Sequence, residues 1–278
     1  MKLEIHQSWW AMTGLGNGSR EWTLKEKFEN IAEAGFSGIL GQLPAPAEAD
    51  TWRRLLDDYG FSFGVQAFPF PKLGDDLTPY FARAKAFGVQ YVNAQILHPY
   101  LEGQPAADFV AGFIRQAAEA GLPFFVETHR GRITQDLRRT AQLVEALPQL
   151  RLTIDFSHYV VGEGMDRAVA DETAEGYLQT LLMRASSIHA RISNGHQVQV
   201  DVGEDASHPA VQPFLRWWRS GMANWRRTAT AGDVFPFVCE LGPPAYAITH
   251  GVSLEEASDR WKQALVLKRL GEQAWAEA

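Results

Sequence analysis

The chain has 278 residues, of which 46% are hydrophobic and 21% are charged, and this composition excludes a disordered or fibrous protein. Its formal net charge of −7 repels phosphate backbones, so we expect no nucleic-acid partner. A single cysteine and the lack of any apolar run of about 20 residues exclude a disulfide framework and a membrane span, so we expect a cytoplasmic protein.

Short apolar segments alternate with longer amphipathic segments along the chain. Strands are predicted over residues 3–7, 37–41, 62–67, 89–95, 123–128, 152–156, 187–192 and 235–240. Helices are predicted over residues 24–34, 47–59, 77–87, 106–120, 135–147, 168–184, 211–227 and 254–275. Thr23 and Ser253 are each followed three residues later by a glutamate, and this spacing predicts a capping box at both positions.

Eight strand–helix units in series predict a parallel sheet, because each strand is apolar on both of its faces. Closure into a barrel leaves no unpaired edge, and such a barrel typically needs about 250 residues. The alternative, an open doubly wound sheet, lacks support because no Gly-x-Gly-x-x-Gly follows the first strand. We therefore expect a single (β/α)8 TIM barrel domain over residues 1–278, with long functional loops at 68–76 and 193–209.

The last four predicted strands each end in a side chain that can bind a metal: Glu127, Asp155, His189 and Glu240. In a parallel barrel these strand ends meet at the C-terminal mouth, where active sites lie. Three carboxylates around an imidazole repel one another unless a cation or protons neutralise them. A divalent metal ion provides that charge. Three oxygen ligands and one nitrogen favour Mn²⁺, Mg²⁺ or Co²⁺, and Zn²⁺ is an open alternative.

Four segments in the second half of the chain resemble the xylose isomerase-like barrel superfamily, in particular its sugar phosphate isomerase/epimerase branch with the ketose 3-epimerases. They are Glu127-Thr-His-Arg-Gly, Asp155-Phe-Ser-His, His189-Ala-Arg and Glu240-Leu-Gly. The resemblance implies one metal ion held by these four leading residues. It further implies that Glu127 and Glu240 transfer a proton on opposite sides of a substrate carbon, while His158 and Arg191 hold substrate hydroxyls.

Further substrate-binding candidates lie near the same barrel mouth. His98 ends the fourth predicted strand, and His129 lies two residues beyond Glu127. Trp9 and Trp10 follow the first strand, and aromatic rings suit the faces of sugars. For each of these residues the alternative is a structural role in the core or on the surface.

These residues predict a metal-dependent isomerase or epimerase that acts on a keto sugar or related polyol. No lysine ends strands four to eight, which favours proton abstraction next to a carbonyl over a hydride shift. An inosose-type dehydratase would use the same site. We expect a small-molecule partner, without a phosphate because no phosphate cradle is evident, and leave a homodimer open.

Two other functions remain as alternatives. An apurinic-endonuclease-like phosphodiesterase with additional zinc ions would recruit His98, His158 and His208. Against it, Ala67-Phe68-Pro69 ends the third strand, where that family has a histidine. The last alternative is a barrel without activity that binds a sugar or a partner protein.

Overall fold

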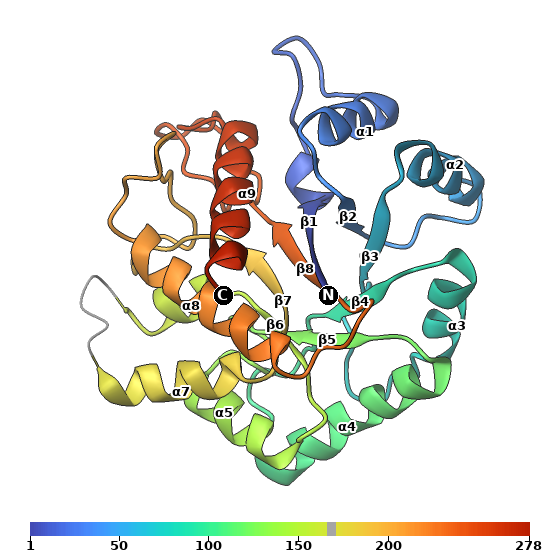
Figure 1. Ribbon diagram of the computed structural model, residues 1–278, viewed down its shortest axis with the longest axis vertical. Coiled ribbons are helices and arrows are strands. Elements are labelled where there is room, and N and C mark those ends of the chain that lie inside the picture. The colour runs from blue at the N-terminus through green and yellow to red at the C-terminus, as the bar shows by residue number, and fades with distance from the viewer. Residues whose placement is uncertain (166–170) are drawn as a thin grey trace.

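The computed structural model, which describes residues 1–165 and 171–278, is a closed barrel of eight parallel strands paired in chain order (Figure 1). The strands are β1 (Lys2–Ser8), β2 (Gly38–Gly41), β3 (Ser62–Gln66), β4 (Tyr91–Ala94), β5 (Phe124–Glu127), β6 (Leu152–Ile154), β7 (Ala185–Ala190) and β8 (Val234–Cys239). Pairing of β8 with β1 closes the barrel, with Ile5 opposite Phe237. Each strand overlaps a predicted one, so the predicted (β/α)8 barrel is confirmed.

Helices surround the barrel (Figure 1). They are α1 (Leu24–Glu33), α2 (Ala49–Tyr59), α3 (Thr78–Phe87), α4 (Gly103–Ala120), α5 (Leu137–Ala146), α6 (Ser157–Gly162), α7 (Glu172–Leu182), α8 (Val211–Arg226) and α9 (Arg260–Ala276), with a 3-10 helix η1 (Trp10–Met12) after β1. The sequence did not predict the short helix α6. Part of the helix predicted over residues 168–184 falls on residues 168–170, which lie outside the described residues, and its described part is α7.

The two predicted capping boxes have different outcomes. The one at Thr23 is confirmed, because its side chain accepts a hydrogen bond from the backbone of Glu26 and the Glu26 carboxylate accepts one in return. The one at Ser253 is wrong. Ser253 Oγ donates to the backbone oxygen of His250, and α9 begins at residue 260 with Asp259 as its N-cap.

The strands alternate between two environments, the helix layer and the barrel interior. Cys239, the last residue of β8, is fully buried. Inside the barrel, Leu40, Tyr91, Phe125 and Val238 form a small apolar cluster, in which the rings of Tyr91 and Phe125 stack at 5.4 Å.

A buried polar network adjoins this cluster inside the barrel. Ser62 Oγ donates to Glu4 Oε2 at 2.7 Å and lies 2.9 Å from His6 Nε2. The Tyr91 hydroxyl lies 3.3 Å from His6 Nδ1. A glycine on β3 makes room for this ring, because a Cβ at Gly64 would lie 2.3 Å from Tyr91 Cζ.

We predict that Gly64→Ala destabilises the protein by about 1–3 kcal/mol, the usual cost of overpacking a core. Gly176→Ala is the matched control, because a Cβ at this exposed position on α7 meets no atom within 4 Å. Alanine should stabilise that helix by about 0.5–1 kcal/mol. Urea denaturation of both variants measures the two free energies of unfolding, and an equal effect of the two substitutions would contradict the packing described for β3.

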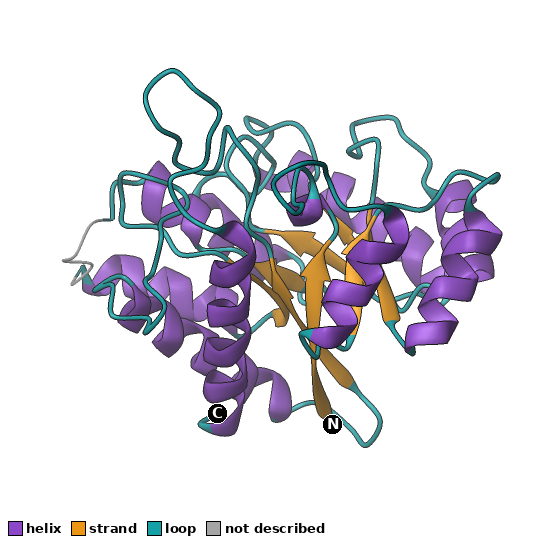
Figure 2. Cartoon of the chain, turned by 90° about the horizontal axis from the view of Figure 1, so that it is seen from above, coloured by secondary structure: helices purple, strands orange, loops and turns teal. Residues whose placement is uncertain are grey.

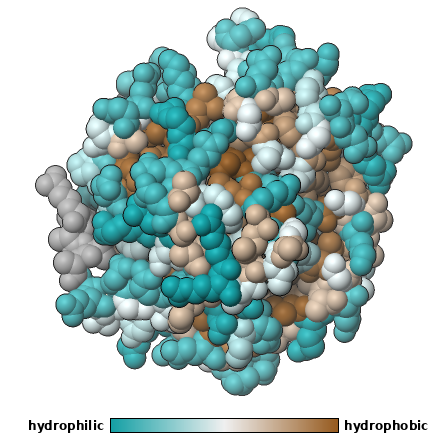
Figure 3. Space-filling view, viewed as in Figure 1, coloured by the Kyte–Doolittle hydropathy of each residue, from teal (hydrophilic) through white to brown (hydrophobic). Residues whose placement is uncertain are grey.

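The two ends of the barrel differ in character. Figure 2 shows the long loops that follow the strands on one side and both termini on the opposite side. The face that carries the termini presents mainly hydrophilic side chains with hydrophobic ones between them (Figure 3). Because the long loops follow the strands, they shape the face onto which the C-terminal ends of the strands open.

No helix in the described ranges is long and apolar enough to cross a bilayer.

Candidate metal centre and substrate cavity

The structure places the four predicted metal-binding residues at the C-terminal ends of neighbouring strands. Glu127 is the last residue of β5 and His189 lies near the end of β7, while Asp155 and Glu240 directly follow β6 and β8. All four side chains are buried. Their positions follow from the parallel topology, which points every strand toward the same end of the barrel.

Three of these residues, Glu127, His189 and Glu240, form a compact group of potential ligands, the candidate metal-binding group. His189 Nδ1 lies 3.1 Å from Glu240 Oε2 and 3.5 Å from Glu127 Oε2. The ligand atoms of the three residues all lie within 4.8 Å of one another. Two carboxylate oxygens and one imidazole nitrogen suit a divalent ion such as Mn²⁺, Mg²⁺ or Zn²⁺, so the donor set fits the expected metal.

The electrostatics of the group also call for a positive charge. Burial lowers the pKa of His189, but the carboxylates of Glu240 and Glu127 outweigh burial and raise this pKa to about 10. Burial raises the pKa of Glu127 and Glu240, yet chiefly His189 holds the pKa of both carboxyls below their usual range. Protonated His189 thus neutralises part of the acidic charge in the metal-free protein, and a metal ion would take over that role.

Glu127 is held in place by two amides from β4 and the segment that follows it. Asn93 Nδ2 donates to Glu127 Oε2 at 2.7 Å. Gln95 Nε2 donates to both carboxylate oxygens, at 3.1 and 3.2 Å. These donors fix the carboxylate and favour its charged form.

Asp155 lies beside the three-residue group and outside it. Its Oδ2 accepts a hydrogen bond from Arg191 Nη1 at 2.7 Å, and its Oδ1 accepts one from Ser157 Oγ at 2.5 Å. Burial raises the pKa of Asp155 to about 6, even though Arg191 opposes the rise. The role of Asp155 as a fourth metal ligand therefore stays a prediction, and in this structure the side chain pairs with Arg191.

Arg191 bridges two of the predicted ligands and is fully enclosed. Besides Asp155, it donates from Nη2 to Glu240 Oε2 at 2.9 Å and from Nε to the Glu240 backbone oxygen at 3.0 Å. Its guanidinium lies over the ring of Tyr246 at 4.8 Å. Arg191 thus contributes a fixed positive charge next to the metal-binding group and lines the cavity beside it.

A second group of potential ligands consists of Glu127, His129 and His158. The ring centres of His129 and His158 lie 3.7 Å apart, with the two rings tilted by 40°. Arg191 Nη1 lies 3.2 Å from His158 Nε2, where it donates to the neutral ring. Burial lowers the pKa of His129 to about 4 and that of His158 well below its usual value. The adjacent guanidinium occupies His158 and disfavours a second cation here.

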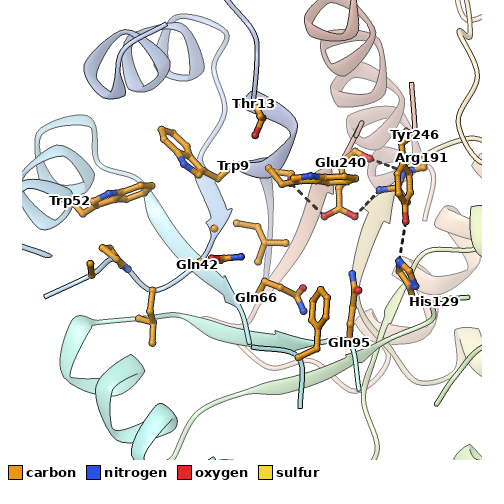
Figure 4. Close-up of a pocket in the computed structure, with 18 of the residues that line it drawn as sticks. Trp9, Thr13, Gln42, Trp52, Gln66, Gln95, His129, Arg191, Glu240 and Tyr246 are labelled. Carbon is orange, nitrogen blue, oxygen red and sulfur yellow. Dashed lines mark hydrogen bonds and ion pairs between the residues drawn. The ribbon is translucent and has the colours of Figure 1, made fainter. Parts of the chain in front are cut away.

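A cavity of about 690 Å³ lies beside the metal-binding group, and Glu240 is the member of that group that lines it. It is lined by Ser8, Trp9, Trp10, Thr13, Leu40, Gly41, Gln42, Leu43, Pro44, Ala45, Glu48, Trp52, Gln66, Phe70, Gln95, His129, Arg132, Arg191, Glu240 and Tyr246. Figure 4 shows one side marked by Trp9 and Trp52 and the other by His129, Arg191, Glu240 and Tyr246. A cavity of this size and mixed polarity suits a small organic molecule.

The predicted substrate-binding residues divide into two sets. Trp9, Trp10, His129 and Arg191 line the cavity. His158 and His98 are not among the lining residues, so a substrate-binding role for these two side chains stays a prediction. His158 is buried behind His129, whereas His98 has a φ of 69° and accepts a hydrogen bond from the backbone of Leu73 at 3.0 Å. This turn directs its imidazole toward the loop after β3.

Several lining residues had no place in the predicted site. Gln66 and Gln95 did carry a signal in the sequence, because each is a polar residue at or just beyond the end of a largely apolar strand. Arg132 and Tyr246 lie in loops and carry no such signal. Of the two loops expected to shape the site, 68–76 contributes Phe70 and 193–209 contributes no lining residue. The segment between β2 and α2 supplies much of the wall instead.

The raised pKa of His189 predicts how metal binding depends on pH. Folded metal-free protein binds more protons than unfolded protein between pH 6.5 and about 10, so its stability falls as the pH rises through this window. Metal binding must displace that proton, so Mn²⁺ affinity should rise about tenfold per pH unit below pH 10. Titration calorimetry at pH 6.5, 7.5 and 8.5 in buffers of different ionisation enthalpy measures the Mn²⁺ affinity and the number of protons released on binding. Binding without pH dependence or proton release would contradict the role of His189.

Comparison with solved structures finds barrels of the same fold. One is the probable 3-DHS dehydratase AsbF from Bacillus anthracis, with 15% identity, a TM-score of 0.59, and coverage of 96% of this chain and 98% of that one. Another is a xylose isomerase-like TIM barrel protein from Mycobacterium smegmatis in complex with magnesium, with 12% identity, a TM-score of 0.60, and coverage of 99% and 97%.

A third is a sugar phosphate isomerase/epimerase from Parabacteroides distasonis, with 12% identity, a TM-score of 0.57, and coverage of 100% and 99%. No protein-family model and no curated protein matches the sequence. At these identities the similarity shows the fold and leaves the activity open. The structure is similar to xylose isomerase-like TIM barrels, as the sequence motifs predicted.

Proposed function

We propose that the chain is a divalent-metal-dependent isomerase or epimerase that acts on a keto sugar or related polyol by proton abstraction next to a carbonyl. The observation that carries this proposal is the buried group of Glu127, His189 and Glu240, whose ligand atoms lie within 4.8 Å of one another beside the cavity. A divalent ion held there would stabilise the negative charge that develops on a substrate oxygen when the neighbouring carbon loses its proton.

Glu127 and Glu240 supply the proton-transfer groups in this proposal. They come from different strands, β5 and the end of β8, and each has its own hydrogen-bond donors. Burial alone would raise the pKa of each carboxyl, but chiefly His189 keeps it below its usual value, so both are ionised at neutral pH and can accept a proton. Two carboxylates allow one to remove a proton and the other to return it, which inverts or relocates a stereocentre.

The cavity offers groups that suit several hydroxyls. The amides of Gln42, Gln66 and Gln95 provide both donors and acceptors. The Tyr246 hydroxyl lies 3.3 Å from His129 Nε2, so these two side chains form a second polar wall. The indole of Trp10, which meets the ring of Tyr246 edge-on at 5.1 Å, offers an apolar face to a sugar ring.

Dehydration is the nearest variant of this proposal. Removal of the same proton followed by loss of a β-hydroxyl would require the same carboxylates and the same metal, so product analysis must separate the two reactions. The phosphodiesterase alternative has less support. Among its expected extra ligands, His98 bonds to Leu73, His158 contacts Arg191, and His208 Nδ1 accepts from the backbone of Ala210.

The test combines metal analysis with hydrogen exchange. Protein equilibrated with Mn²⁺ and dialysed should retain about one metal ion per chain by mass spectrometry. In D₂O it should exchange the proton next to the carbonyl of at least one member of a ketose and inosose panel, followed by NMR. Retention of several zinc ions would favour the phosphodiesterase. A protein that binds no metal would overturn the proposal.

A further inference from the structure

We infer that Arg132 selects a substrate that carries a negatively charged group, a carboxylate or a phosphate, within this cavity. The inference rests on the proposed function, because it adds one chemical feature to the substrate of the same site. It is carried by the orientation of Arg132, by its lack of an acidic partner and by the charge of the surrounding group.

The guanidinium of Arg132 is held in a defined position on the cavity wall. Its Nε donates to Gln95 Oε1 at 3.2 Å and its Nη1 donates to the backbone oxygen of Gly131 at 3.0 Å. Its Cζ lies over the Phe70 ring, 4.5 Å from the ring centre. An arginine held in this way is already oriented to bind an anion, so less side-chain entropy is lost on binding.

The same contacts connect Arg132 to the metal-binding group. Gln95 accepts from Arg132 through its oxygen and donates to both carboxylate oxygens of Glu127 through its nitrogen. Two hydrogen-bond links therefore separate the guanidinium from a proposed proton-transfer group. A charged substituent bound by Arg132 would lie close to the reacting carbon of the substrate.

Arg132 differs from the other arginine of the cavity in its partners. Arg191 is paired with Asp155 and Glu240 at 2.7 and 2.9 Å. In the part of the chain that the structure describes, no carboxylate lies within 4.0 Å of the Arg132 guanidinium, and its Nη2 makes no hydrogen bond to protein. The unused N–H groups match the oxygens of a carboxylate or phosphate.

The sum of charges at the site with a divalent ion bound also favours an anionic substrate. The carboxylates of Glu127, Asp155 and Glu240 balance the two charges of a divalent ion and the one charge of Arg191. The positive charge of Arg132 is then in excess on the substrate side. The remaining acidic residue of the cavity wall, Glu48, is exposed to solvent just before α2. A singly charged substrate anion would neutralise the excess.

Calorimetry on the Mn²⁺-loaded protein tests this with two pairs of probes that differ in one charged group. Gluconate is paired with glucitol, and glucose 6-phosphate with glucose. We expect the anion of one pair to bind at least about tenfold more tightly than its neutral partner, as for hydrogen bonds to a charged group. The pair that shows the preference identifies carboxylate or phosphate as the preferred group.

Three variants assign the preference to a residue. Arg132→Gln should bring the affinity ratio close to one, and Arg132→Lys should restore part of it through charge alone. Arg54→Gln, on the exposed surface of α2, is the matched control and should leave the ratio unchanged. Manganese content measured on each variant shows whether the metal site remains filled.

Two results would overturn the inference while leaving the proposed function intact. One is equal binding of anions and neutral partners to metal-loaded wild type. The other is a preference that persists in Arg132→Gln, which would assign it to the metal ion or to Arg191. Conversely, an Arg132-dependent preference in a protein that exchanges no substrate proton would support the inference and overturn the proposed activity.

Discussion

Replacement of Glu127 by glutamine is expected to remove tight metal binding and to lower turnover by about 10²–10⁴-fold. The amide has no charge to balance a divalent ion, and it would set its own NH₂ group against the donors of Asn93 and Gln95 that now face the carboxylate. Mass spectrometry of Mn²⁺-equilibrated protein measures the first effect, and deuterium exchange measures the second.

Glu145→Gln is the matched control for this prediction. Glu145 is exposed on α5, away from the cavity, so the same chemical change should leave metal content and exchange at wild-type levels. Circular dichroism of both variants shows whether they fold. A folded Glu127→Gln protein that retains its metal would place the ion elsewhere and remove the main support for the proposed function.

The largest expected effect on stability follows from Arg191→Met. Methionine fills a similar volume but leaves the buried carboxylates of Asp155 and Glu240 without their partner, and loss of one member of a buried ion pair typically costs about 3–5 kcal/mol. Mn²⁺ should recover part of this loss because it supplies positive charge. The loss should also shrink near pH 5, where Asp155, whose pKa burial raises to about 6, is protonated.

Urea denaturation with and without Mn²⁺ at pH 7 and pH 5 measures these effects. Arg219→Met is the control, since Arg219 pairs with Glu277 near the surface and its loss should cost no more than about 1 kcal/mol. If Arg191→Met costs no more than this control at pH 7 without metal, the buried ion pairs described for Arg191 do not contribute to stability.

The fold was predictable from the sequence because each strand and most helices carry a local signal. The start of α9 was not, because tertiary contacts override that signal. Arg260 is buried, donates to the backbone oxygen of Thr13 at 2.8 Å and pairs with Glu256. A bridge between Thr249 and Glu256 holds the preceding segment away from helical geometry. The capping sequence at Ser253 cannot compete with these contacts.

The candidate site was predictable only to the level of strand ends. The sequence placed Glu127, His189 and Glu240 at one mouth, and the structure brings them together. It could not show that Asp155 pairs with Arg191, because this depends on how β6 and β7 are aligned, and their register shifts between Leu152 and Thr153. Contacts made by loop side chains depend on chain paths that no local pattern encodes.

The close approach of Gly64 to Tyr91 has a consequence for the evolution of the barrel. Because a Cβ on β3 and the phenol ring on β4 would compete for the same space, positions 64 and 91 should vary together among related sequences. A larger residue at position 64 should occur where position 91 is small. In the same way, the space at Gly38, where a Cβ would lie 2.6 Å from His6 Nε2, should couple positions 6 and 38. Related sequences in which both pairs, 64 with 91 and 6 with 38, vary together would share this packing of the barrel interior.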